Sequence, residues 1–419
     1  MTPRDAARAI LDSALAAGDV TPLVGRHLGL DARYRRVVVL GCGKASAAMA
    51  AAADEVLGDR LAGGFVVVKD GCAVPVSRVE IAEAGHPVPD ERGLAASARL
   101  LELAHAAGEE SLVLFLVSGG GSALTPAPAP PITLAEKQEV TRLLLASGAT
   151  IGELNAVRKH LSRFKGGQLA RAAWPASVLT LALSDVIGDP LDVIASGPTA
   201  PDSTTFADAR EVLARRGLAG RVPASVAARL EAGLRGEIEE TPKPGDRLFG
   251  RVTSVVIGNN ALIADAAVAA ASRLGYRPHL ATRELQGEAR EVARDLVARA
   301  RGLEPPACLI AGGETTVTVK GTGRGGRCQE FALAAALELL PTDRMTVLAA
   351  GTDGTDGPTD AAGAIVDGHS IARGTRAGGD VHRAMTDNDA HRFLAASGDL
   401  IVSGPTRTNL LDLYVVLRS

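Results

Sequence analysis

Aromatic residues are scarce in this chain of 419 residues: they make up 3% of it, too few to expect a surface that stacks nucleic-acid bases. Charge of one sign is missing as well, because the formal net charge of -3 gives no electrostatic reason to bind nucleic acid or an acidic membrane. No segment has the length of a membrane span without charges or glycine clusters. We therefore expect neither a nucleic-acid-binding module nor a membrane protein.

Cysteine is also rare, and the four cysteines are widely spaced with no C-x-x-C pair. A zinc ribbon or a disulfide framework is therefore not expected, and reduced thiols in a cytoplasmic protein are the simplest interpretation. Residues 1–8 carry an acid and lack the apolar core of a signal peptide. Glycine, in contrast, stands in several short loops directly after apolar runs.

The most informative stretch is residues 112–124, where an apolar run of strand length ends in Ser118, three glycines and Ser122. A run without alternation predicts a strand buried on both faces, as in a parallel sheet. Three residues without Cβ let successive backbone N–H groups turn toward one concavity, and the two serines add hydroxyl donors. This loop is therefore predicted to bind an anion at the carboxyl end of its strand. A tight turn without a ligand is the alternative.

A second loop of this kind contains Lys44. Residues 37–40 predict a buried strand that runs into Gly41-Cys-Gly-Lys44, and an alanine-rich helix follows to about residue 57. A cation is unfavourable at the positive end of a helix unless an anion binds beside it. The succession of strand, glycine loop, lysine and helix therefore predicts an anion site. A solvated lysine is the alternative, and the spacing matches neither a Walker A loop nor the dinucleotide fingerprint. His86, between Gly85 and Pro87, is interpreted as a histidine that hydrogen-bonds its own loop.

Segment 151–167 is the most basic of the chain. Read as a helix, it places Arg158, Ser162 and Lys165 on one face. A solvated helix is the ordinary interpretation, and a cationic rim for phosphates stays open.

An acidic loop follows the predicted strand 177–183 and includes Asp185, Asp189 and Asp192. Carboxylate oxygens near a phosphate site suit Mg²⁺, which keeps several waters and needs only one or two carboxylates. Polar residues 236–250, rich in proline and glycine, then predict a linker. The expected division is a first domain at 1–235 and a second at 251–419.

In the second half, β-branched alternation predicts a strand at residues 315–320. The loop after it holds Arg324 and Arg327 among glycines and is expected to open a helix over 331–340. Two arginines there can donate bidentate hydrogen bonds to phosphate, whereas a mobile glycine hinge is the alternative.

Loops of this kind recur over nearly the whole chain in one order, and together they resemble the glycerate 2-kinase family, a group once mislabelled as hydroxypyruvate reductase. The motifs that carry the resemblance are Gly41–Lys44, Gly85–Asp90, Val117–Ser122, Asn155–Ser162, Ser184–Asp189, Ser196–Thr199, Gly312–Thr315, Gly323–Arg327 and Gly351–Asp356. The resemblance implies a Rossmann-like, mostly parallel sheet domain, a second and smaller α/β domain, and an active site in the cleft between them. It also implies phosphorylation of D-glycerate to 2-phosphoglycerate by ATP, with a divalent metal.

Phosphoryl transfer depends on positioning and charge stabilisation, so cations, backbone donors and Mg²⁺ are expected to converge. We hypothesise that Lys44 contacts the transferring phosphoryl group or the glycerate anion. Asp185 and Asp189 would bind Mg²⁺ or accept the proton of the substrate hydroxyl, and Arg324 and Arg327 would hold charge from across the cleft. The residues expected to contact glycerate or phosphate oxygens are Gly43, Ser118, Gly119, Gly120, Gly121 and Ser122.

Two other functions are weighed against this one. A hydroxypyruvate reductase that uses NAD(P)H would need a G-x-G-x-x-G turn with an acidic residue about twenty positions later, and none is apparent. A non-catalytic anion-binding protein is disfavoured because so many glycine, cation and acid loops occur together. The assembly state is left open, with a homodimer as one option.

Overall fold

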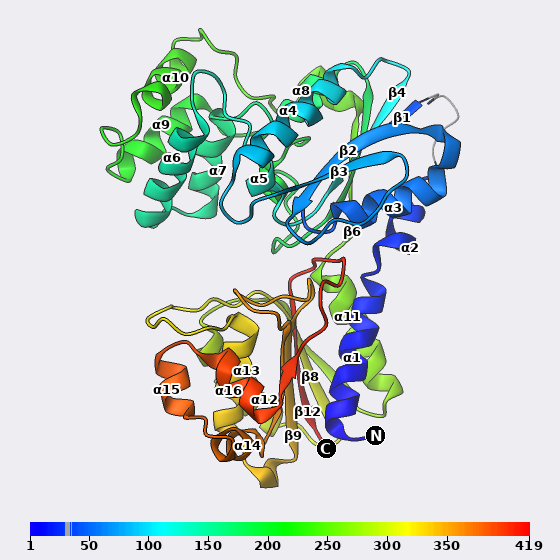
Figure 1. Ribbon diagram of the computed structural model, residues 1–419, viewed down its shortest axis with the longest axis vertical. Coiled ribbons are helices and arrows are strands. Elements are labelled where there is room, and N and C mark those ends of the chain that lie inside the picture. Colours follow the sequence, from blue (N-terminus) through cyan, green and yellow to red (C-terminus); the bar gives the residue numbers. More distant parts are fainter. Residues whose placement is uncertain (30–33, 35) are drawn as a thin grey trace. The chain divides into compact units, whose positions relative to one another are not determined.

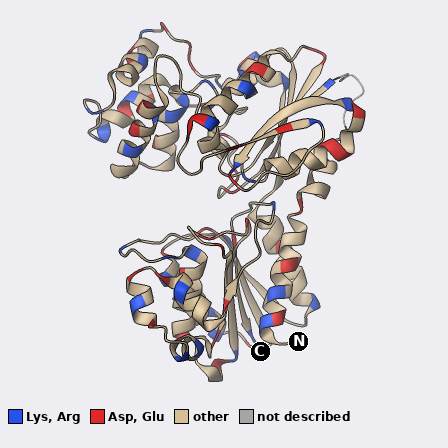
Figure 2. Cartoon of the chain, viewed as in Figure 1, with Lys and Arg blue, Asp and Glu red and all other residues tan. Residues whose placement is uncertain are grey.

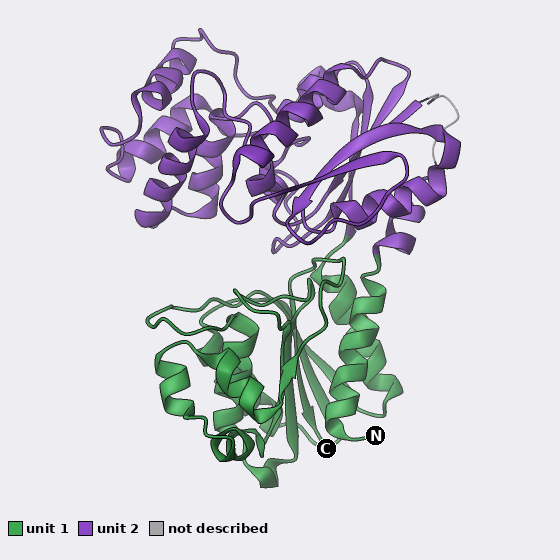
Figure 3. Cartoon of the chain, viewed as in Figure 1, with its two compact units in different colours: residues 1–19, 258–419 green, residues 20–257 purple. Residues whose placement is uncertain are grey.

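The computed structural model describes residues 1–29, 34 and 36–419, which form two compact units (Figure 3). Unit 1 comprises residues 1–19 and 258–419, and unit 2 comprises residues 20–257. This division differs from the expected one, because the N-terminal segment groups with the C-terminal half. Residues 252–258, which the expected boundary would assign to the second domain, form a strand of the unit 2 sheet.

Unit 2 is built on a six-stranded sheet with the order β3-β2-β1-β4-β5-β6. β1 pairs in parallel with both β2 and β4, and the β2–β3 and β4–β5 pairs are parallel too. This is the strand order of a Rossmann fold, so the expected Rossmann-like, mostly parallel sheet is confirmed. The strands are β1 (Arg36–Cys42), β2 (Leu61–Lys69), β3 (Val79–Ala84), β4 (Ser111–Val117), β5 (Ser177–Leu183) and β6 (Val252–Gly258).

Helices cover both faces of this sheet, which explains the unbroken apolar run of β4 (Figure 1). Val113, Phe115 and Val117 pack in the core on the side of α4 and α8, and the alternate residues of β4 face α3. The helices around this sheet are α2 (Val20–Gly25), α3 (Ser46–Leu57), α4 (Glu91–His105), α5 (Gly121–Leu124) and α8 (Gln168–Ala173). The 3₁₀ turns of the unit are η1 (Gly58–Arg60), η2 (Ile194–Ser196) and η3 (Arg247–Arg251).

A helical lobe of unit 2 packs around its own apolar cluster, which includes Leu144, Val157 and Phe206. Its helices are α6 (Leu134–Ala146), α7 (Ile151–His160), α9 (Phe206–Arg215) and α10 (Ala224–Leu234). α6 begins with a capping box, in which Thr133 accepts from the N–H of Glu136 and the Glu136 carboxylate accepts from the N–H of Thr133. The cap fixes where α6 starts and therefore which of its residues face the apolar cluster of the lobe.

Unit 1 contains a mixed six-stranded sheet with the order β11-β10-β9-β12-β8-β7. β12 runs antiparallel to both β8 and β9, whereas β7 and β8 are parallel. Its strands are β7 (Arg277–Leu285), β8 (Ala307–Gly313), β9 (Met345–Gly351), β10 (Gly363–Asp367), β11 (Leu400–Ile401) and β12 (Asp412–Arg418). Its helices are α1 (Pro3–Ala17), α11 (Asn260–Arg273), α12 (Ala289–Arg301), α13 (Arg327–Glu338), α14 (Ser370–Arg376), α15 (Val381–Thr386) and α16 (Ala390–Ser397), with the 3₁₀ turn η4 (Pro341–Asp343).

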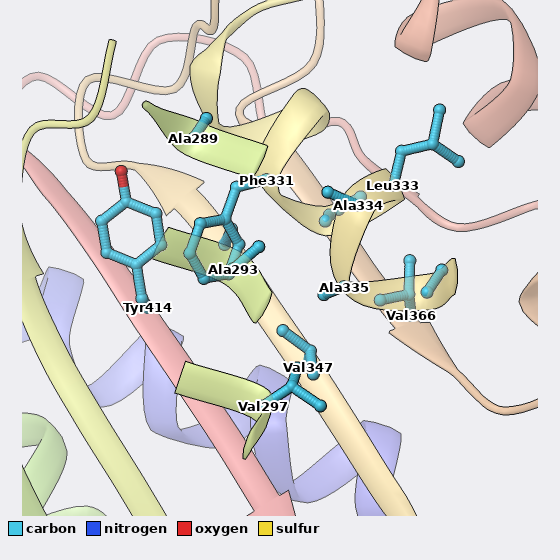
Figure 4. Close-up of a cluster of buried hydrophobic side chains, with 14 of the residues drawn as sticks. Ala289, Ala293, Val297, Phe331, Leu333, Ala334, Ala335, Val347, Val366 and Tyr414 are labelled. Atoms are coloured by element: carbon cyan, nitrogen blue, oxygen red, sulfur yellow. The ribbon is translucent and has the colours of Figure 1, made fainter. Parts of the chain in front are cut away.

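α1 and α11 cover one face of this sheet, and α12 and α13 cover the other (Figure 1). α1 belongs here because its buried stripe, which includes Ile10 and Leu11, packs beside α11. On the opposite face the rings of Phe331 and Tyr414 lie against each other with centroids 4.6 Å apart (Figure 4). Five consecutive small or apolar residues of α13, 332–336, are buried and let this helix approach the sheet closely.

Charged residues lie mainly on helices and loops, and the strands of both sheets are largely free of them (Figure 2). Within the described residues, no helix combines the length and the apolar character needed to cross a membrane.

The strand predicted at 315–320 is wrong. Only Thr316 forms an isolated bridge there, with Glu288. Side chains take the backbone donors of this segment instead: the carboxylate of Glu288 accepts from the N–H of Thr318, and the Asn388 side chain accepts from the N–H of Lys320. The β-branched alternation therefore gives an extended segment without a ladder partner. The helix after it also starts earlier than predicted, at Arg327.

Candidate active site

The loops that follow β1 and β4 meet where the strand order of the unit 2 sheet reverses. β1 and β4 are neighbours, and the chain runs outward from them in opposite directions, which makes this edge the place where open α/β sheets bind ligands. The N–H of Lys44 donates to the carbonyl of Gly119 over 2.9 Å, and the N–H of Ser118 donates to the carbonyl of Cys42 over 3.1 Å. The structure thus brings Lys44 and the triple-glycine loop together.

Gly43 and Ser118 are packed directly against each other. Gly43 has a φ of 128°, and a Cβ built on it would lie 2.4 Å from both the carbonyl oxygen and Oγ of Ser118. The buried hydroxyl of Ser118 accepts a hydrogen bond of 2.9 Å from the N–H of Ala45. Gly43 and Ser118, which the sequence suggested as ligand contacts, therefore pack the two loops together at the start of α3.

Gly120 lies between the side chains of His86 and Lys44. A Cβ on Gly120 would be 3.1 Å from the His86 ring and 3.5 Å from Cγ of Lys44, and its φ of 85° favours glycine. Gly121 is equally confined, because a Cβ there would be 2.8 Å from Sγ of Cys42. The sequence interpretation of His86 as a purely local group missed its contact with the triple-glycine loop.

Ser122 links the triple-glycine loop to two other segments. Its Oγ accepts from Nη2 of Arg158 over 2.7 Å and lies 2.9 Å from Oγ of Ser196. Ser196 in turn donates to Oδ1 of Asn155 over 3.0 Å. Three motifs that are far apart in sequence are therefore joined by one hydrogen-bonded chain.

The basic segment 151–167 is not the solvated helix considered from the sequence. α7 ends at His160, and Lys165 lies beyond it with 0% of its surface exposed. Lys159 is buried too, and its Nζ lies 3.3 Å from a carboxylate oxygen of Asp192 and 3.3 Å from one of Asp202. These partners come from other parts of the chain, so the charge pattern alone could not indicate burial.

A pocket of about 690 Å³ opens beside the triple-glycine loop, and four cationic side chains line it: Lys137, Arg142, Arg158 and Lys165. Nζ of Lys165 donates to the carbonyl of Ser122 over 2.7 Å and to that of Thr125 over 3.0 Å. Burial lowers the pKa of the Lys137 and Lys165 ammonium groups well below their usual range, and the neighbouring cations lower it further. Burial also lowers the pKa of Arg158 to about 10.

Lys137 was missed from the sequence, although one signal was present. It occupies the apolar stripe of α6, between Leu134 and Val140, where a charged residue is out of place. Its Nζ donates to the carbonyls of Pro126 and Leu161, so Lys137 ties α6 to the chain on either side of the pocket.

Asp185 and Asp189 follow β5, the strand next to β4, and both are half-buried. They therefore belong to the same edge of the sheet as the triple-glycine loop. Within the described residues, no three histidine, cysteine, aspartate or glutamate side chains converge as a metal site. The role of these two carboxylates as magnesium ligands stays a prediction.

Arg327, in unit 1, has partners other than the predicted phosphate. Its guanidinium donates to both carboxylate oxygens of Asp412, over 2.6 and 2.9 Å, and Nη1 lies 2.7 Å from Glu314. These contacts outweigh the burial of Arg327, so the pKa of its guanidinium is raised. Tyr414 adds a hydrogen bond of 3.0 Å to Asp412. Arg327 thus links the start of α13 to Asp412 and Glu314.

Arg324 lies in the glycine loop before α13 and is exposed. Its Nη2 donates to the carbonyl of Pro358 over 3.1 Å, and its backbone N–H donates to Asp389. No carboxylate among the described residues forms an ion pair with its guanidinium. Arg324 therefore keeps donors for a ligand.

Asp356, from the acidic loop after β9, caps α13. Its carboxylate accepts from the N–H groups of Cys328 and Gln329 over 3.2 and 2.8 Å. Burial raises the pKa of Asp356 to about 6, and the nearby charge of Asp412 acts in the same direction. This carboxylate has a structural role in the loop that presents Arg324.

Comparison with known proteins places these features in one family. Residues 6–231 match a domain of unknown function, DUF4147, and residues 307–412 match the MOFRL family. A D-glycerate 2-kinase from Thermotoga maritima is 45% identical over 390 residues, which cover 91% of this chain and 90% of the relative. A relative from Agrobacterium vitis, provisionally named hydroxypyruvate reductase, is 44% identical and covers 100% of this chain and 95% of its own.

The fold agrees with a solved member. The crystal structure of a glycerate kinase from Thermotoga maritima matches with a TM-score of 0.88 at 43% sequence identity, over 99% of each chain. With such identity along nearly its whole length, the chain belongs to the glycerate 2-kinase family.

Proposed function

We propose that this chain transfers the terminal phosphoryl group of ATP to the 2-hydroxyl of D-glycerate, giving 2-phosphoglycerate and ADP. The observation that carries the proposal is the meeting of Lys44, His86 and the triple-glycine loop at one edge of the sheet, beside a pocket bordered by buried cations. Phosphoryl transfer needs positioned cations and backbone donors more than a covalent nucleophile. Relatives named D-glycerate 2-kinase and glycerate kinase support the choice of substrate.

In this proposal Lys44 stabilises negative charge on the transferring phosphoryl group or on the glycerate carboxylate. The hydrogen bond from its N–H to Gly119 fixes its backbone, and its side chain passes beside Gly120. Backbone N–H groups of residues 119–122 add donors to the same oxygens. In unit 1, Arg324 is our candidate for a phosphate-binding cation, and Arg327 positions the loop that carries it.

The residues present suit a magnesium ion as well. Asp185 and Asp189 would hold it, because Mg²⁺ takes one or two carboxylates and keeps several waters. The ion would supply charge neutralisation to the phosphate oxygens when bound. The same carboxylates are candidates to accept the proton of the glycerate hydroxyl as it attacks.

Two paired assays test the proposal. ADP release with D-glycerate measures the kinase reaction, and phosphorus NMR of the product distinguishes 2-phosphoglycerate from 3-phosphoglycerate. NADH oxidation with hydroxypyruvate measures the reductase alternative. ADP release that yields 2-phosphoglycerate, without NADH oxidation, is expected. The reverse pattern would establish a reductase, and activity in neither assay would leave a non-catalytic anion-binding protein.

A further inference from the structure

Three of the four cations that line the pocket of unit 2, Lys137, Arg158 and Lys165, have no carboxylate partner among the described residues, whereas Arg142 pairs with Glu139 over 2.7 Å. Lys137 and Lys165 donate only to backbone carbonyls, and Arg158 donates to the carbonyl and hydroxyl of Ser122. Nε of Arg158 is buried with no acceptor among the described residues. Lys159, one position further along the chain, provides the contrast, because it is paired with Asp192 and Asp202.

Buried charge without a counter-charge is unfavourable for the free protein. Lys137 and Lys165 are 5% and 0% exposed, and burial together with the nearby charge of Arg158 makes the charged form of each ammonium group less favourable. Carbonyl groups alone would be satisfied by neutral donors, so hydrogen bonding to the loop does not require three positive charges. An anion in the adjoining pocket would supply the missing negative charge.

The walls of the pocket show which kind of anion fits. Its volume of about 690 Å³ is far larger than a three-carbon acid needs and lies in the range of sites for larger ligands. Pro87, Val88 and Pro89 form part of the wall, and Leu145 of α6 forms another part. Val88 and Leu145 are 66% and 61% exposed, so both side chains have apolar surface that a ligand in the pocket can contact.

We propose that this pocket binds the nucleotide, with the base against the Val88 and Leu145 side chains and the phosphates toward Arg158 and Ser122. This assignment rests on the proposed function, because it names the place of its phosphoryl donor. Gly120 borders both the pocket and the Lys44 side chain, so a nucleotide held there directs its terminal phosphate toward Lys44. Lys137 and Lys165 also line the pocket and add positive charge near the phosphates.

The chain offers a matched pair of variants for the apolar wall. Leu145 and Ile151 are both 61% exposed and lie on consecutive helices of the same lobe, but only Leu145 lines the pocket. Leu145→Gln and Ile151→Gln are neutral changes at exposed sites, so both proteins are expected to fold. Arg158→Met removes the charge, and its fold is checked by circular dichroism and thermal melting.

Calorimetric titration of the full chain with β,γ-imido-ATP, inorganic tripolyphosphate and D-glycerate, each alone, tests the assignment. Leu145→Gln is expected to weaken imido-ATP binding about fivefold and to leave tripolyphosphate binding unchanged, since it removes only apolar contact. Arg158→Met is expected to weaken both phosphate compounds by about tenfold or more. Ile151→Gln should match the unsubstituted protein for all three ligands, and glycerate affinity should stay within about twofold in every variant.

The assignment is overturned if Leu145→Gln binds imido-ATP as tightly as the Ile151→Gln control, if the substitutions weaken glycerate instead, or if imido-ATP does not bind. Failure of the proposed reaction is a separate result. A chain that shows the expected pattern of imido-ATP affinities but forms no phosphoglycerate keeps this nucleotide site and loses the kinase assignment. A chain that forms 2-phosphoglycerate with pocket variants of unchanged imido-ATP affinity keeps the kinase assignment and loses this site.

Discussion

The guanidinium of Arg327 and the buried carboxylate of Asp412 form a bidentate ion pair, with donor–acceptor distances of 2.6 and 2.9 Å. Arg327 is the first residue of α13, and Asp412 is the first residue of β12. The pair therefore ties the glycine loop that carries Arg324 to the middle of the unit 1 sheet, where β12 lies between β9 and β8.

Breaking this pair is expected to destabilise unit 1. Asp412→Asn leaves the partly buried Arg327 without its main counter-charge, and the loss of one partner of a buried pair costs about 3–5 kcal/mol. Glu314 contacts the same guanidinium but is 41% exposed, so Glu314→Gln is the matched control and should cost less than about 1 kcal/mol. Urea unfolding of both variants measures the difference, and equal losses would show that the Arg327–Asp412 contact does not anchor the loop.

The carboxyl of Asp356 is expected to make stability depend on pH. Its pKa is raised to about 6 from 3.8, so the folded protein keeps a proton that the unfolded chain has already lost. The contribution of this group to the free energy of unfolding is therefore greatest below about pH 4, falls as the pH rises to about 6, and is constant above that.

Asp356→Asn cannot titrate and isolates this effect. The free energy of unfolding of the original chain minus that of the variant should fall between about pH 4 and about pH 6, measured by urea titration at each pH. A difference that stays constant or rises over this window would contradict the raised pKa of Asp356.

The sheet of unit 2 was the most predictable part of the molecule, for a physical reason. Strands β4 and β5 are buried on both faces, so their apolar runs are local signals that need no knowledge of a partner. The strand predicted at 315–320 fails because a strand also needs a ladder, and here Glu288 and Asn388 take the backbone donors. Local alternation does not contain that information.

The candidate site divides in the same way. Lys44 and the triple-glycine loop could be recognised because glycines directly after strands have a local meaning. The burial of Lys165 could not, because its partners are backbone carbonyls, which every sequence contains, whereas Lys137 had one signal, its position in the apolar stripe of α6. We predicted phosphate as the partner of Arg327. The sequence around Arg327 does not indicate its ion pair with Asp412, because that residue lies 85 positions away.

Replacing Lys44 by alanine is expected to lower turnover by about a hundredfold or more, the loss seen when a group that stabilises transition-state charge is removed. The melting temperature should hardly change, since the hydrogen bond from residue 44 to Gly119 uses the backbone and survives the substitution. Lys69→Ala is the control, because Lys69 ends β2 on the same edge of the sheet but outside the β1–β4 junction. Initial rates of ADP release with D-glycerate measure the effect, and a fully active Lys44→Ala variant would refute the role of this lysine.

A methyl group at position 43 is expected to force the β1 and β4 loops apart. The Cβ of Gly43→Ala would lie 2.4 Å from the backbone and hydroxyl oxygens of Ser118, which cannot move away without breaking the hydrogen bond from Ala45. Gly63→Ala is the matched control, because Gly63 has a similar φ of 134° but its nearest neighbour would be 3.6 Å from the new Cβ. Both variants carry the cost of an unfavourable φ, so the additional loss in Gly43→Ala, about 2 kcal/mol by urea unfolding, reports the steric clash alone. If the two variants were equally stable and equally active, the loops would accommodate the new Cβ without cost. The close packing of Gly43 against Ser118 would then not be what holds Lys44 in place.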